Sequence, residues 1–288
     1  MTCGLFIGHL GLGDQVLLAP AIHYLATTRG YSKLFVVVKD IYMETIRHLL
    51  SAEQVSANTT IAEICYLPIK ATANFSEEIS AILSIIKTID NSCQPINVHA
   101  SGHYNNQLQD PNDFPINFYR QLGISWEAAI TKFFVPCTTK STKLACLLTY
   151  IPYIFIHDIS STCRIDSEIS ANASIDGTGT AGKVLNNVIK RCSGEYFLVN
   201  PEKNMYKQGH VFYELAEQFL REKNSLTLID YKTVIENAAE LHMITSCYFC
   251  FAAGLLGVRA KVKIAYSRSK DRFPTIAGDW TYVDIDGT

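Results

Sequence analysis

A glycine-rich turn and the carboxylate that follows it are the first feature of the sequence that could do chemistry. Gly8, Gly11 and Gly13 stand between a short apolar segment and an apolar run at 15–27, and Asp14 follows the last glycine. This pattern predicts a strand before the turn and a helix after it. Because backbone amides at a helix N-terminus attract anions, we interpret Gly11 and Gly13 as candidate phosphate-binding positions.

Two alternatives exist for this turn. Its glycine spacing is G-x-x-G-x-G, which differs from the G-x-G-x-x-G fingerprint of dinucleotide-binding proteins. Asp40 ends the next expected strand, where that fingerprint has its ribose-binding acid, so an NAD-dependent dehydrogenase is one alternative. The other concerns Asp14 alone, which would act as the N-cap of the helix.

A second group of polar residues stands at the ends of strands expected in the second half of the chain. Ligands bind at the carboxyl ends of the strands in open parallel sheets, so these residues are expected to line one site. Ser246 precedes an apolar segment at 247–255, and we expect it to cap a helix whose first amides face a bound diphosphate. The candidate binding residues of this half are His157, Lys203, His242, Ser246, Cys247, Tyr248 and Arg268.

The cations of this group would neutralise a phosphate. The guanidinium of Arg268 suits bidentate contact with phosphate oxygens, and Lys203 and Lys207 would add positive charge. For His242 a buried histidine within the core of the sheet remains the alternative.

Strands that alternate with helices predict an α/β fold with parallel sheets in the first half. The polar segment 136–143 has no periodicity and is expected to be a linker. Before it we expect strands at 5–8, 33–38, 61–66, 95–100 and 131–135, and helices at 15–27, 43–50, 76–89 and 118–122.

The alternation restarts near Tyr150 and predicts a second α/β half. The Ser-, Gly- and Thr-rich segment 165–183 is expected to be a surface loop, because it lacks the Lys-Ser/Thr ending of a P-loop. We expect strands at 151–157, 196–200, 226–229, 241–245 and 261–266, and helices at 211–223, 233–239 and 247–255.

Composition narrows the classes of partner. The chain has 288 residues, of which 48% are hydrophobic, and its 25 Lys and Arg nearly balance its 27 Asp and Glu. This balance argues against nucleic acid and anionic membranes as partners. The longest apolar stretches are too short to span a membrane, and no targeting signal is evident at the N-terminus, so we expect a cytoplasmic protein.

The nine cysteines are an odd number and are scattered along the chain. We expect them to be mostly reduced and buried, without a complete disulfide framework. Cys247 and Cys250 form a C-x-x-C pair that, with His242, could suggest zinc. No second ligand pair has the required spacing. We therefore prefer the interpretation that the two cysteines lie on a helix and pack in the core.

The run from Gly11 to Ile22 resembles a known motif. It reads GLGDQVLLAPAI and is similar to the N-terminal motif of heptosyltransferase-like glycosyltransferases (glycosyltransferase family 9), in which G-x-G-D precedes an apolar run and Pro-Ala. The segment from Leu241 to Leu255 resembles the donor-binding strand, loop and helix of such enzymes. In this chain Ser246-Cys247-Tyr248 replaces the small-residue turn that the family has after the strand.

The resemblance implies the GT-B fold, in which two Rossmann-like domains face each other across a cleft. An acceptor-side domain would span 1–140 and a nucleotide-sugar-binding domain would span 141–288. Hexosyl or heptosyl transfer from a nucleotide-diphosphate sugar to a hydroxyl of a glycan, lipid-linked glycan or protein acceptor is the implied reaction. Asp14 matches the aspartate taken as the base that deprotonates this hydroxyl.

We expect neither a metal ion nor any cofactor besides the nucleotide-sugar substrate. Helix amides and the cations described above would neutralise the leaving diphosphate. One base without a second carboxylate as nucleophile favours inversion at the anomeric carbon. A nucleotide-sugar epimerase and a non-catalytic domain that binds sugars or proteins are the alternatives, and the epimerase would act without an acceptor.

Overall fold

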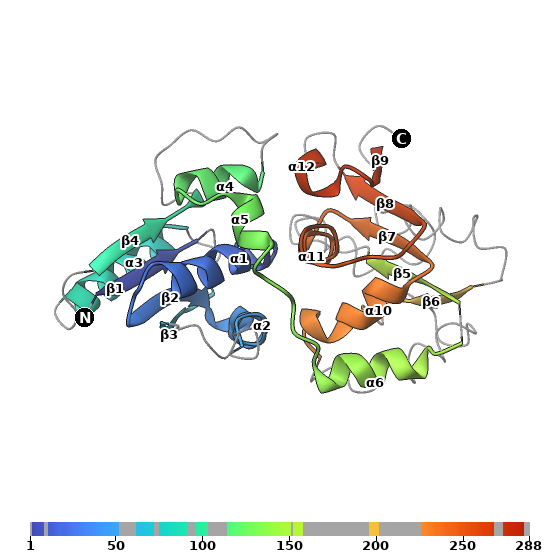
Figure 1. Cartoon of the computed structure of the whole chain (residues 1–288), viewed down its shortest axis with the longest axis horizontal. Coiled ribbons are helices and arrows are strands. Elements are labelled where there is room, and N and C mark those ends of the chain that lie inside the picture. Colours follow the sequence, from blue (N-terminus) through green and yellow to red (C-terminus); the bar gives the residue numbers. More distant parts are fainter. Residues whose placement is uncertain are drawn as a thin grey trace. The chain divides into compact units, whose positions relative to one another are not determined.

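The computed structural model describes residues 2–8, 11–51, 62–71, 75–90, 96–102, 114–150, 152–157, 196–201, 226–267 and 273–284. The chain divides into two compact units, Met1–Pro136 (unit 1) and Cys137–Thr288 (unit 2), each built on its own sheet (Figure 1). The predicted boundary after residue 140 falls inside a helix of unit 2, α6 (Thr139–Leu147).

Unit 1 contains a four-stranded parallel sheet with the order β3-β2-β1-β4. Of the two central strands, β1 is wholly buried and β2 is buried at Leu34 and at 36–38, and both contain the apolar residues expected of strands covered on both faces. The strands are β1 (Cys3–Ile7), β2 (Lys33–Lys39), β3 (Glu63–Ile69) and β4 (Ile96–Ala100).

Helices cover both faces of this sheet. Leu5 and Ile7 of β1 share a core with Ile82 and Ile89 of α3 (Phe75–Asp90). Side chains alternate along a strand, so Phe6 lies on the opposite face, with α1 (Leu12–Thr28), the short η1 (Asp40–Tyr42) and α2 (Met43–Leu49). Unit 1 is therefore a doubly wound α/β domain.

Two short helices, α4 (Ile116–Gln121) and α5 (Trp126–Ile130), complete unit 1. The hydroxyl of Tyr119 donates to the carbonyl of Leu17 at 2.7 Å and so ties α4 to α1. The strand expected at 131–135 does not form: Thr131 donates its hydroxyl back to the Glu127 carbonyl at 2.9 Å and closes α5, and irregular chain follows.

Unit 2 contains a five-stranded parallel sheet with the order β6-β5-β7-β8-β9. The four-residue β9 was not expected, since β8 was predicted to be the last strand. The strands are β5 (Tyr153–His157), β6 (Phe197–Val199), β7 (Glu240–Ile244), β8 (Val262–Ser267) and β9 (Thr281–Asp284).

Two predictions for unit 2 are wrong because short polar segments cap helices. Thr138 accepts a hydrogen bond from the Ser141 amide at 2.9 Å, so α6 begins inside the expected linker. At 226–229 a 3₁₀ helix, η8 (Leu228–Tyr231), replaces the expected strand, because Thr227 and Asp230 form a capping box. The remaining helices are α10 (Lys232–Asn237), α11 (Cys247–Leu255) and α12 (Pro274–Ala277).

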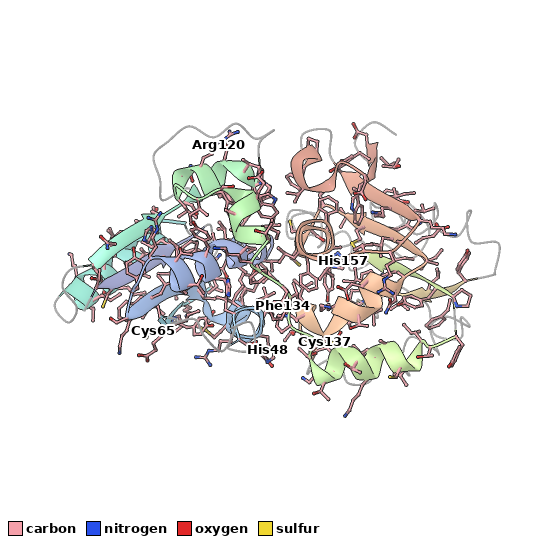
Figure 2. All side chains as sticks on the ribbon, viewed as in Figure 1. His48, Cys65, Arg120, Phe134, Cys137 and His157 are labelled. Carbon is pink, nitrogen blue, oxygen red and sulfur yellow. The ribbon has the colours of Figure 1, made fainter. Side chains whose placement is uncertain are left out.

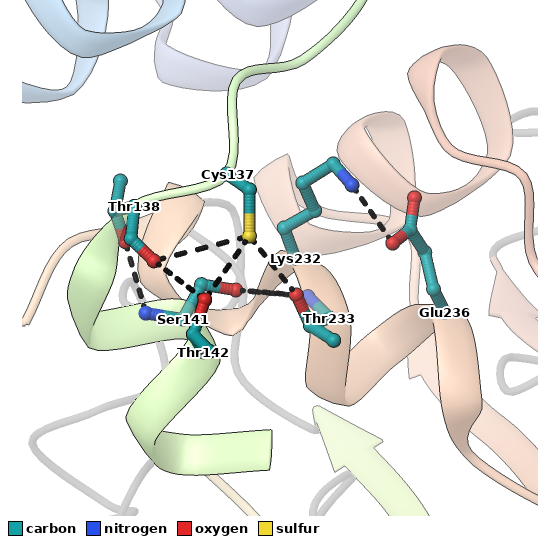
Figure 3. A network of polar contacts seen from close by, with 7 residues as sticks. All are labelled: Cys137, Thr138, Ser141, Thr142, Lys232, Thr233 and Glu236. Carbon is teal, nitrogen blue, oxygen red and sulfur yellow. Dashed lines mark hydrogen bonds and ion pairs between the residues drawn. The ribbon is translucent and has the colours of Figure 1, made fainter. Parts of the chain in front are cut away.

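The start of α6 is bound to η8 and α10 by a network of side-chain hydrogen bonds, and Figure 3 shows the part of the network that joins α10. The Thr138 hydroxyl donates to the Asp230 carboxylate at 2.6 Å, and the Ser141 hydroxyl donates to Thr233 Oγ1 at 2.9 Å. The exposed Cys137 thiol lies 3.5 Å from the hydroxyls of both Thr142 and Thr233. This network fixes the first residues of unit 2.

The helices in the described ranges are all too short or too polar to cross a membrane. The predicted helix at 211–223 and the predicted loop at 165–183 lie outside the described residues.

Candidate functional site

Both sheets change the direction of their connections beside their first strand. In unit 2, β6 lies on one side of β5 and β7 lies on the other. In unit 1, β2 and β3 follow on one side of β1, and β4 lies on the other. Ligands of open α/β sheets bind at such switch points, outside the carboxyl ends of the strands. The two candidate ligand positions are thus the ends of β5 and β7 and the ends of β1 and β4.

The switch point of unit 2 joins two of the predicted residues. His157 (Figure 2) ends β5 and is 4% exposed. Ser246 follows β7. Ser246 Oγ lies 2.9 Å from His157 Nδ1. Ser246 occupies the N-cap position of α11, as predicted, but its side chain makes no capping hydrogen bond. Its hydroxyl instead holds the imidazole across the two strands.

Tyr248 adds an aromatic surface to this pair. Its ring centroid lies 4.3 Å from that of His157, with 34° between the ring planes. Phe155 and Tyr231 surround it at centroid distances of 6.0 and 5.8 Å. Cys247 and Tyr248 form the first turn of α11, whose positive dipole end attracts anions. Imidazole, hydroxyl, phenol ring and helix terminus together suit a planar or anionic ligand.

His242 does not join this group. β5 and β7 pair with His157 opposite Met243 and Ile156 opposite His242, so the two histidines lie on opposite faces of the sheet. His242 is fully buried, with Nδ1 2.9 Å from the Tyr266 hydroxyl and Nε2 3.1 Å from the Glu240 carboxylate. Both ring nitrogens therefore have partners within the sheet.

The predicted cations of this half, Lys203, Lys207 and Arg268, lie outside the described residues. Asn200, which follows β6, is 1% exposed. Ser267, at the end of β8, is fully buried, and its hydroxyl has no hydrogen-bond partner within the described part of the chain.

The glycine turn of unit 1 has a different arrangement from the one expected. α1 begins at Leu12 with Gly11 as its N-cap, so Asp14 lies within the first turn and is not the N-cap. Gly13 is also helical. A Cβ atom on Gly8 would come within 2.8 Å of Leu18 Cδ1, so close packing accounts for this glycine. The half-buried Asp14 carboxylate thus stands at the positive end of a 17-residue helix.

Sequence reasoning missed two polar residues of this edge, Gln15 and Ser101. Both are at least nine-tenths buried. A glutamine inside an otherwise apolar helix was the only available signal for the first. Asp40, the residue on which the dehydrogenase alternative depends, accepts hydrogen bonds from the backbone amides of Ile41 and Ala71 at 2.8 and 3.0 Å.

No three His, Cys, Asp or Glu side chains within the described ranges are close enough together to hold a metal ion. The sequence does contain one Asp-x-Asp triplet, the pattern of metal-bridged diphosphate sites, at Asp284-Ile285-Asp286. Asp284 ends the edge strand β9, and Asp286 lies outside the described residues. The metal-free reaction remains a prediction.

No family model and no curated protein matches the chain. The solved structures that are similar to it include two E. coli heptosyltransferases. The structure of E. coli ADP-heptose LPS heptosyltransferase II has a TM-score of 0.51 and 10% identity, over 98% of this chain and 90% of that one. E. coli heptosyltransferase WaaC with ADP has a TM-score of 0.42 and 11% identity, over 99% and 93%. The first similarity and the two parallel sheets confirm the predicted α/β fold of the GT-B type.

Proposed function

We propose that the protein is a glycosyltransferase that moves a hexosyl or heptosyl group from a nucleotide-diphosphate sugar to an acceptor hydroxyl. The observation that carries the proposal is the group His157, Ser246 and Tyr248 at the switch point of unit 2. The likeness to heptosyltransferase II, which the chain shares over nearly its full length, supports the same class of reaction.

In this proposal unit 2 holds the donor. The diphosphate lies against the first turn of α11, where the helix dipole stabilises negative charge as it grows on the leaving group. Ser246 and the His157 imidazole are hydrogen-bonding groups beside it. Lys203 and Arg268 would add positive charge. Their assignment to the donor site depends on the sequence alone, because both lie outside the described residues. We do not assign a donor contact to His242, because its ring nitrogens are engaged within the sheet.

Unit 1 would supply the base. Asp14 accepts the proton of the acceptor hydroxyl while the oxygen of that hydroxyl attacks the anomeric carbon. The bond between the anomeric carbon and the nucleoside diphosphate breaks. A single base and direct attack would give inversion. We propose that the transfer requires no metal ion and no cofactor, and that the acceptor is a glycan, a lipid-linked glycan or a protein.

A thermal-shift panel of nucleoside diphosphates and nucleotide sugars tests the donor site. We expect one family of diphosphates to raise the Tm, with the same shift in the presence of magnesium or of a chelator. Tyr248→Ala should abolish most of this shift, whereas Tyr150→Ala, which alters a fully exposed tyrosine of the same unit, should retain it. A panel without any shift would contradict the proposal, and a shift only with magnesium would contradict the metal-free reaction.

A further inference from the structure

The side-chain amide of Gln15 has no hydrogen-bond partner within the described part of the chain. Gln15 is 5% exposed, and both its Nε2 and its Oε1 are buried. Buried polar groups in folded proteins are nearly always paired, because an unpaired one loses its water without replacement. An amide kept in this state in the first turns of α1 indicates a partner beyond the described residues, and a bound ligand is one such partner.

Gln15 borders a small cavity at the carboxyl edge of β1 and β2. Gly8 also lines it, and the other lining residues are apolar side chains of the two strands, α1 and α2. The cavity has room for about one water-sized group. A sugar hydroxyl has this size.

Ser101 is a second buried polar group at the same edge. Its amide donates to the Ile7 carbonyl at 2.9 Å, which places Ser101 beside Gly8 at the switch point between β1 and β4. Ser101 is fully buried, and its hydroxyl has no partner among the described residues. The following Gly102 has a φ of 72° and donates its amide to Gln121 Oε1 at 2.7 Å, so the backbone here is fixed by α4.

The chemistry of this edge favours a neutral ligand. An amide and a hydroxyl can each donate and accept, which matches the hydroxyl groups of a sugar. None of the residues that line the cavity is charged. The nearby cation Lys39 lies on the opposite face of the sheet, where its ammonium is bound to Glu78 at 2.6 Å. An anionic group here would be buried without a counter-charge.

We propose that Gln15 and Ser101 form a hydroxyl-binding subsite that selects an uncharged, polyhydroxylated acceptor, such as a neutral sugar unit. The subsite rests on the proposed function, since it gives the acceptor a place in the same unit as Asp14. It makes the two residues determinants of specificity that contact the acceptor, while the proton transfer stays with Asp14.

The test measures stability and sugar binding in the absence of any nucleotide. Saturation-transfer NMR compares methyl α-D-glucopyranoside with its charged analogue, methyl α-D-glucopyranosiduronate. We expect the unaltered protein to bind the neutral glycoside in preference. Gln15→Met and Ser101→Ala should weaken this binding by about tenfold, and Ser80→Ala, on the exposed face of α3, should leave it unchanged.

The Tm of the ligand-free variants separates a subsite from an internal structural role. Removing a buried group that has no partner should leave the Tm unchanged or raise it. A lower Tm would overturn the proposal, since it would mean that the group is paired in the free protein, for instance with a buried water. Equal binding by the variants, or preference for the uronate, would also overturn it. Glycoside binding without any nucleotide response would instead defeat the proposed function and leave the subsite standing.

Discussion

The carboxyl edges of the two sheets differ in the side chains that form them. In unit 2 the edge is aromatic and already hydrogen-bonded, with Ser246 and Tyr248 both in contact with His157. In unit 1 the edge is glycine and mostly aliphatic side chains, with the aromatic ring of Phe6 among them and with the amide of Gln15 and the hydroxyl of Ser101 buried.

Under the proposed function, the difference suggests how one fold would bind two ligands. The phenol ring of Tyr248 and the imidazole of His157 are already in contact, so they suit a flat, charged ligand whose binding needs little rearrangement. Buried polar groups without partners discriminate more than they stabilise, because a ligand that lacks the matching hydroxyl leaves them unpaired. We therefore expect unit 2 to dominate affinity and unit 1 to dominate chemistry and selectivity.

The largest expected effect separates the chemistry of unit 1 from the binding of unit 2. Asp14→Asn removes the proposed base, so the rate of sugar transfer should fall by about 100- to 10,000-fold. Nucleotide binding, measured by thermal shift, should be retained because its proposed contacts lie in unit 2. Transfer at the unaltered rate would show that Asp14 is not the base.

A second contrast concerns thiol reactivity within unit 2. Partial burial raises the pKa of the Cys137 thiol, but the hydrogen bonds with Thr142 and Thr233 and the nearby Lys232 ammonium outweigh it, so the pKa lies below its usual value. A larger thiolate fraction should make Cys137 react severalfold faster with iodoacetamide near neutral pH than the exposed Cys146. Mass spectrometry of timed samples measures both rates, and equal rates would contradict the prediction.

Thr138→Ala tests whether the network at the start of α6 stabilises unit 2. The variant loses the N-cap bond to the Ser141 amide and the hydrogen bond to Asp230. We expect the free energy of unfolding to fall by about 1–2 kcal/mol. Denaturant titration measures this change, with Thr149→Ala, at an exposed position two residues beyond the end of the same helix, as the control. A loss no larger than that of the control would mean that the network adds little stability.

The smallest expected effect is an acid sensitivity of unit 1. Burial lowers the pKa of His23 below 6.5, and burial with the nearby Arg29 lowers that of His99. The unfolded chain therefore binds more protons as the pH falls below about 6.5, so stability declines from there toward the lowered native pKa. His23→Gln should flatten this decline in unfolding curves from about pH 7 to about pH 5. An unchanged slope would contradict it.

Much of the fold could be predicted because the buried strands and long helices have clear patterns. The predicted bounds of α11 match the structure, and β2 ends one residue later than predicted. The errors concern α6, η8, β9 and the strand expected at 131–135. Thr138 and the Thr227–Asp230 pair cap helices in polar segments, a four-residue strand pairs at the edge of the sheet, and irregular chain follows α5. Local caps and edge pairing leave weak periodic signals.

The candidate site could be predicted only in part, because it depends on strand order and register. His157 and Ser246 are 89 residues apart, and they meet because β5 pairs with β7. The same register places His242 on the other face, which polarity alone could not indicate. Gln15 and Ser101 were missed because a polar residue in the sequence, whether in an apolar helix like Gln15 or at a strand end like Ser101, gives no sign that its partner is absent.

The stacking of Tyr248 beside His157 also makes the edge of unit 2 observable. A phenol ring 4.3 Å from an imidazole perturbs the magnetic environment of the imidazole protons through its ring current. Any ligand that enters beside them and shifts either ring would move those resonances. The imidazole resonances of His157 thus report ligand binding in an NMR spectrum. The resonances of the enclosed His242 in the same spectrum serve as the reference.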